Sequence, residues 1–67
     1  MNNTMKFLVE KSDSGKRLDV FLAEKIKNQT RSNIKKSIEL KNVNINKKVV
    51  NSPSKKVRID DVIIIDI

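Results

Sequence analysis

The side chains best suited to chemistry in this sequence are its cations, several of which stand where a helix is expected to begin. Arg17 opens one amphipathic segment, Arg31 opens the next, and Lys35 follows one turn later. Backbone N–H groups at a helix start attract phosphate, and an arginine adds a bidentate donor. Lys47 and Lys48 lie at a predicted hairpin tip. Cations at a helix start and at a hairpin are therefore expected to bind one polyanion from two sides.

The carboxylates offer no convincing catalytic pair. Asp60 and Asp61 are the only adjacent ones, and acidic residues in a turn normally stay solvated. Asp19 is best explained as a favourable charge near a helix N-terminus. The chain has no histidine, the usual general base, and its one glycine cannot build a glycine-rich phosphate loop. We predict no catalytic residue and no enzyme activity in this chain by itself.

The composition bounds the size and type of the protein. With 67 residues, the chain is one domain with a small aliphatic core and no room for a small-molecule pocket. The absence of cysteine excludes disulfides and thiolate zinc sites, and we expect no metal and no cofactor. Residues 1–5 are predicted to be a disordered tail and residues 6–67 the domain, which we expect to be a monomer.

The net charge of +7 and the pI near 10.0 favour a polyanionic partner, because cations gain affinity for a phosphate backbone through counterion release. The same lysines would also serve solubility alone. No apolar run approaches the roughly 20 residues that span a bilayer, and the N-terminus lacks the apolar stretch of a signal peptide. We therefore expect a cytoplasmic protein without a membrane partner.

The first half of the chain predicts a strand and two helices. Residues 6–10 are typical of an edge strand with Phe7 and Val9 on one face, and residues 11–16 form a turn cluster. Residues 17–27 predict a helix, with an apolar stripe at helical spacing formed by Leu18, Phe21, Leu22 and Ile26. Thr30 is a good N-cap for a second helix over 31–41, expected to end at Asn42 and to bury Ile34, Ser37, Ile38 and Leu40.

The second half changes to a period of two. Val43, Ile45 and Val49 alternate with polar residues around a tight turn at 46–47, and Pro53 follows the hairpin. Residues 62–67 begin with an apolar run typical of a central strand, with residues 7–9 as the expected neighbour. Two helices followed by a meander predict an α+β fold in which the helices pack on a small, mostly antiparallel sheet.

The two aromatic residues, Phe7 and Phe21, fit the apolar stripes and are expected in the core. The chain therefore lacks the exposed aromatic platforms on which single-stranded bases stack. Recognition of folded RNA through its shape and phosphates fits this sequence better.

Several motifs occur together in a familiar order: GKRLDVFLA at 15–23, TRSNIK at 30–35 and VNINKKVV at 43–50. They resemble the RNA-binding domain named after ribosomal protein S-four, and Pro53, Lys56-Val57 and Asp61-Val62-Ile63 resemble its closing segment. The resemblance implies the αL-type RNA-binding fold. FLVE at 7–10 before GKRLD is most similar to the N-terminal domain of large-subunit ribosomal RNA pseudouridine synthases.

This resemblance implies binding of structured, ribosomal RNA, with RNA modification carried out by a separate catalytic domain. Residues 17–19 spell RLD, as does that domain's catalytic motif, but this copy belongs to the binding motif and carries no catalytic role. The RNA-binding residues implied are Arg17, Arg31, Ser32, Lys35, Lys36, Lys41, Lys47 and Lys48.

Three positions depart from the family pattern, which favours glycine where this chain has Asn42, Lys47 and Asp60. We expect the fold to survive with a slightly different hairpin turn, because lysine pays more than glycine at positive φ. Three alternatives stay open. They are a free-standing binder of ribosomal or transfer RNA, a protein-interaction domain, and a DNA-binding helix-turn-helix protein, the last disfavoured by the β-rich second half.

Overall fold

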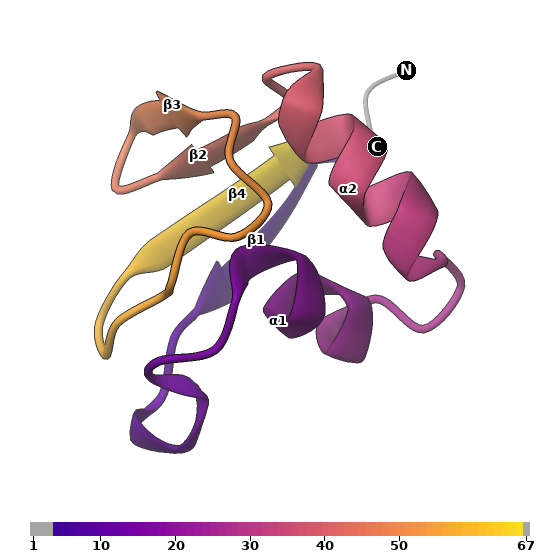
Figure 1. The fold of residues 1–67 in the computed structure, drawn as a ribbon. Helices are drawn as coiled ribbons and strands as arrows, with labels where there is room; N and C mark the ends of the chain where they lie inside the picture. Colours follow the sequence, from indigo (N-terminus) through magenta and orange to yellow (C-terminus); the bar gives the residue numbers. More distant parts are fainter. Residues whose placement is uncertain (1–3, 67) are drawn as a thin grey trace.

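Two helices and a four-stranded antiparallel sheet make up the computed structural model, which describes residues 4–66. The helices lie on one side of the sheet (Figure 1). The strand order is β1-β4-β2-β3. The strands are β1 (Thr4–Leu8), β2 (Val43–Ile45), β3 (Lys48–Val50) and β4 (Val62–Asp66). This confirms the predicted α+β class.

The last strand, β4, is central, as its apolar run predicts. It pairs on one side with β1, where Phe7 faces Ile63, and on the other with β2, where Val43 faces Ile65. Ile63 and Ile65 are fully buried against the helices, whereas Ile64 on the other face is only half-buried. The strand therefore has one core face and one partly open face. Residue 67 lies outside the described residues.

Strand β1 begins earlier than the sequence predicts. Thr4 and Met5 pair with Asp66 and Ile65, and the Thr4 hydroxyl donates to Asp66 Oδ1 over 2.6 Å. The predicted disordered tail over residues 1–5 is therefore wrong for residues 4 and 5, because β4 is long enough to pair with them. The rest of that tail, residues 1–3, lies outside the described residues.

Helix α1 (Leu18–Lys25) is shorter than the predicted helix over 17–27, but the predicted apolar stripe is buried, with Ile26 directly after the helix. A short 3-10 helix, η1 (Lys11–Asp13), and a turn with Gly15 at φ 91° precede it. Phe21 is buried in the core and meets the half-buried Phe7 edge to face, with ring centroids 6.4 Å apart. Both aromatics therefore belong to the packing of helix on sheet, as predicted.

Helix α2 (Arg31–Glu39) begins at the predicted cap, because the Thr30 hydroxyl accepts a hydrogen bond from Asn33 N at 3.1 Å. It ends before residue 41. Lys41, not Asn42, takes the left-handed conformation, with φ 65°. Asn42 N then donates to Ser37 O, the bond of a Schellman cap.

The early end of α2 leaves Leu40 with 63% of its surface exposed. Its predicted burial is wrong, because the chain reverses directly after it. Ile34 and Ile38 are buried as predicted, and Ser37 is half-buried. The face of α2 that packs on the core is therefore narrower than its apolar residues suggest.

The β2–β3 hairpin turns through Asn46 and Lys47, both with positive φ (52° and 70°). A two-residue turn of this kind pairs Ile45 with Lys48 and Val43 with Val50. Val50, not Val49, therefore shares the inner face, and Val49 is 60% exposed. The predicted alternation is wrong by one residue on the second strand.

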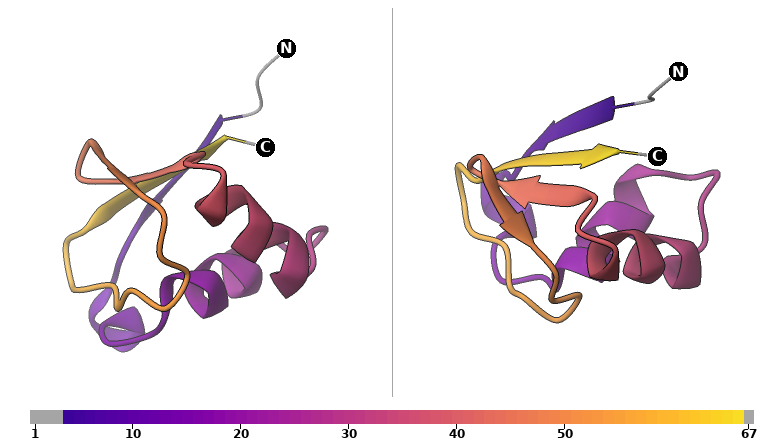
Figure 2. Two further views of the ribbon diagram at one scale, coloured as in Figure 1. Left: turned by 45° about the horizontal axis from the view of Figure 1, so that its top comes forward. Right: turned by 90° about the horizontal axis from the view of Figure 1, so that it is seen from above.

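The loop between β3 and β4 closes the core from the same side as the helices (Figure 2). Val57 in this loop is fully buried, and Arg17 and Lys56 form an isolated antiparallel bridge. The loop therefore lies directly beside the start of α1. Within residues 4–66, no helix is long and apolar enough to cross a membrane.

Candidate nucleic-acid interface

A buried carboxylate, Asp19, joins two arginines at the starts of the two helices. Asp19 is 1% exposed, and its Oδ2 accepts from Arg17 Nη2 at 3.1 Å and from Arg31 Nε at 3.4 Å. The two arginine side chains remain 42% and 56% exposed. Arg17 and Arg31, separated by a whole helix in the sequence, thus lie together with their guanidinium groups partly open to solvent.

Asp19 lies in the first helical turn, as predicted, but its contact with the two arginines was not predicted. Burying a charge is costly unless it is paired, and the two arginines supply the pairing. Two sequence features could have predicted this contact. Arg17 lies two residues before Asp19, and Arg31 begins the next helix, so that packing of the two helices can bring both arginines to one carboxylate.

The start of α1 is not open to phosphate. Leu18 N donates to Lys55 O at 2.7 Å, and Asp19 N donates to Pro53 O at 3.1 Å. The prediction that a phosphate binds free N–H groups at this helix start is therefore wrong, because the β3–β4 loop occupies them. Binding of an anion here depends on side chains.

Helix α2 presents the other predicted side chains to solvent. Arg31 and Lys35 are both exposed and stand four residues apart, which places them on the same helical face. Ser32 and Lys36 are also exposed and lie further round the helix, and Lys41 is exposed beyond its end. No carboxylate in the described part of the chain forms an ion pair with Lys35, Lys36 or Lys41.

The hairpin cations diverge. Lys48 lines a groove beside the β3–β4 loop, whereas Lys47 lies over the outer sheet surface near Val62 and Ile64. The sequence pattern placed the two lysines together at one tip. Lys47 lies in the tight turn and Lys48 begins β3, so their side chains point to different sides of the hairpin and only Lys48 lines the groove.

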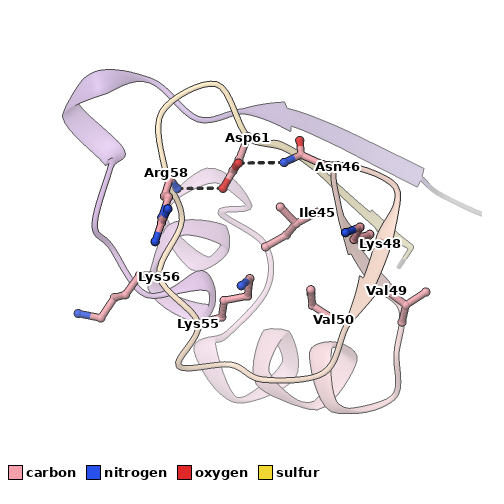
Figure 3. A pocket seen from close by; sticks show the side chains of 9 residues that line it. All are labelled: Ile45, Asn46, Lys48, Val49, Val50, Lys55, Lys56, Arg58 and Asp61. Atoms are coloured by element: carbon pink, nitrogen blue, oxygen red, sulfur yellow. Dashed lines mark hydrogen bonds between the residues drawn. The ribbon is translucent and has the colours of Figure 1, made fainter.

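This open groove has a volume of about 660 Å³ and lies between the hairpin and the β3–β4 loop (Figure 3). Its cations are Lys48, Lys55, Lys56 and Arg58. Of these, only Lys48 belongs to the predicted binding set. The other three come from a segment whose position is set by tertiary packing, so residue spacing carried no signal for them.

Asn46 ties the two walls of this groove together. Its side-chain Oδ1 accepts from Val62 N at 2.9 Å, and its Nδ2 donates to Asp61 Oδ1 at 3.0 Å. Asp61 Oδ2 in turn accepts from Arg58 N at 3.0 Å. The hairpin tip and the loop are therefore held at a fixed separation at this end.

A second charged cluster is structural. Asp13, 5% exposed, pairs with Lys16 at 3.1 Å and with Lys25 at 3.3 Å, and Lys16 also pairs with Glu24 at 2.6 Å. The hydrogen bond from Lys16, aided by Lys25, lowers the pKa of Asp13 below its usual 3.8. The hydrogen bond to Glu24, followed by that to Asp13, raises the pKa of Lys16. These lysines hold the turn before α1 against the helix.

The described residues contain no group of three or more potential metal-ligating side chains. Cations thus lie at the starts of the two helices and along a groove. Together these cations can neutralise several phosphates of one polyanion.

In a comparison with known families, the family model described as the S4 domain matches residues 16–63, well over half of the chain. The matched region includes both helices, the hairpin and the β3–β4 loop. No curated protein matches the chain.

Proposed function

The chain belongs to the S4 domain family and is an RNA-binding domain, and from this premise we propose that it holds structured ribosomal RNA through the α1–α2 face. The observation that carries the proposal is the Asp19 contact, which brings Arg17 and Arg31 side by side while leaving both partly exposed. The remaining residues proposed to bind RNA are Ser32, Lys35, Lys36 and Lys41 on or after α2, and Lys47 and Lys48 at the hairpin tip outside this face.

Arginine is well suited to this role because its planar guanidinium can bind a phosphate through two parallel hydrogen bonds. Each arginine donates one hydrogen bond to Asp19, and each side chain stays partly exposed, so that the exposed part of each guanidinium can still bind a phosphate. Lys35 adds a third cation one turn along α2. A folded ribonucleotide backbone, recognised by shape and phosphate spacing, is the polyanion that this face suits.

Anisotropy of a labelled ribosomal stem-loop RNA, with duplex DNA of the same sequence as competitor at one salt concentration, tests this proposal. The RNA should bind, and the DNA should compete poorly. The double variant R31Q/K35Q should weaken RNA binding and lower the salt slope by about 1 for each phosphate that is no longer neutralised. The matched control K6Q/K11Q removes the same charge from exposed positions elsewhere.

Glutamine is the better replacement at Arg31 because a glutamate would face the buried Asp19 carboxylate. A folded R31Q/K35Q variant with unchanged affinity would contradict the binding face. Equal binding of RNA and DNA would favour the helix-turn-helix alternative. Against that alternative, α2 leads directly into β2, and the described residues contain no third α-helix.

We further propose that this domain serves a pseudouridine synthase in the cytoplasm, as a monomer that supplies RNA affinity to a separate catalytic domain. The support is the resemblance of residues 7–10 and 15–19 to such enzymes. Mapping pseudouridines in ribosomal RNA from cells lacking the gene should show that one modified site disappears. An unchanged map would favour a free-standing RNA-binding protein.

A further inference from the structure

We propose that the groove between the β2–β3 hairpin and the β3–β4 loop binds an unpaired segment of the same RNA whose folded part lies on the α1–α2 face. This inference rests on the proposed function and extends it to a second site. The groove is the open volume of about 660 Å³ that Figure 3 shows.

Within the described residues, no carboxylate forms an ion pair with the cations of the groove. Among residues 4–66, the ion pairs involve Lys16, Arg17, Lys25 and Arg31, and none of the groove cations. The one acid lining the groove, Asp61, already accepts bonds from Asn46 and from the Arg58 backbone. The groove therefore carries a net positive charge that an external anion can neutralise.

Aliphatic side chains lie next to these cations. Ile45 and the half-buried Val50 share the face of the hairpin that lines the groove, and Val49 borders it with its side chain on the other face of β3. In a duplex the faces of the bases are stacked inside, and the protein meets phosphates, riboses and base edges. An unpaired segment can place a base or ribose against the aliphatic wall while its phosphates meet the lysines. The mixture of charge and apolar surface thus favours an unpaired strand.

The groove continues from the α1–α2 face. Arg17 is paired through its backbone with Lys56, and Leu18 N donates to Lys55 O at 2.7 Å. Residues opposite each other in an antiparallel bridge have neighbouring side chains. A strand leaving the Arg17–Arg31 pair therefore meets Lys56 next.

The groove contains no aromatic residue, which decides the kind of binding expected. Proteins that stack bases on aromatic rings gain sequence-tolerant affinity from each base. Here phosphate contacts must dominate, so the contribution of the groove should be strongly salt-dependent and nearly independent of base sequence.

Two labelled RNAs test this inference: a blunt stem-loop, and the same stem-loop with a short oligouridine overhang. Wild-type protein should bind the overhang RNA more tightly. In the variant K56Q/R58Q most of this gain should disappear, and the salt slope for the overhang RNA should fall by about 1.4, or about 0.7 for each of two single-strand phosphate contacts. Binding of the blunt stem-loop should change little.

K6Q/K11Q is the control, because it removes two charges at residues that do not line the groove and should keep the gain. If the wild type binds both RNAs equally, or if K56Q/R58Q retains the gain, the inference is overturned. Failure of the wild type to bind the blunt stem-loop would instead overturn the proposed function on which it rests. Thermal melting of each variant checks that it is folded.

Discussion

Arg31 Nε lies 3.4 Å from Asp19 Oδ2, which links the first residue of α2 to the first turn of α1. The carboxylate is buried, whereas the arginine side chain is 56% exposed. One contact thus serves both the packing of the two helices and the display of a cation. This dual role makes Asp19 a positioning residue for the proposed RNA face.

Replacing Asp19 with asparagine should lower the free energy of unfolding by about 1–3 kcal/mol, because two charge-assisted hydrogen bonds weaken. Because both arginine side chains are partly exposed to solvent, the loss of stability should be smaller than for a fully buried ion pair. Urea denaturation at neutral pH measures it. D60N makes the same charge change at an exposed residue and should be nearly neutral. Equal stabilities of the two variants would show that the Asp19 contact adds little.

Stability at acid pH should depend on Asp13. Its pKa is lowered in the folded protein, mainly by the hydrogen bond from Lys16, so its charged form stabilises the fold. This contribution is complete above the ordinary carboxyl value of 3.8 and is lost as pH falls through the lowered folded value. Urea denaturation of wild type and D13N over this range should show a difference that vanishes in acid. A constant difference would contradict the assignment.

Stability at alkaline pH should depend on the pair formed by Lys16 and Glu24. The pKa of Lys16 is raised above 10.5, chiefly by the hydrogen bond to Glu24. The contribution of the pair is therefore complete below 10.5 and is lost as pH rises through the higher folded value. The variant E24Q should differ from wild type at neutral pH and converge with it in strong alkali. Persistence of the difference there would exclude this cause.

Glycine at the two hairpin positions should act in opposite directions. K47G should stabilise the protein by about 0.5–1 kcal/mol, because Lys47 holds φ 70° and Asn-Gly is the preferred pair for such a turn. N46G also tolerates positive φ but removes the side-chain bonds to Asp61 and Val62. It should destabilise by about 1–2 kcal/mol. Thermal melting distinguishes them, and a shift of both in one direction would contradict this account.

The two neighbouring lysines of this hairpin, Lys47 and Lys48, should contribute differently to RNA binding. Lys48 lines the groove, whereas Lys47 faces the outer sheet surface. K48Q should therefore reduce affinity for the overhang RNA more than K47Q does, although the charge change is identical. Anisotropy at one salt concentration measures the difference. Equal reductions would mean that the RNA approaches the hairpin tip from both sides.

The features that depend on residues close together in the chain were predictable. The apolar stripe of α1, the Thr30 cap and the two-residue turn at Asn46 each follow from local spacing and residue type. The apolar run of β4 likewise predicted a central strand. Errors arose at ends and registers, as with Leu40 and Val49, where one residue changes the face on which a side chain lies.

The sequence by itself thus determined the order of elements, the composition of the core and the presence of cations near two helix starts. Only the tertiary structure decided that Asp19 gathers Arg17 and Arg31, and that Lys55, Lys56 and Arg58 line a groove with Lys48. The physical reason is the distance along the sequence over which each kind of interaction acts. Helix and turn preferences act over a few residues. The bridge between Arg17 and Lys56, in contrast, forms because β4 pairs between β1 and β2, which brings the β3–β4 loop to the start of α1.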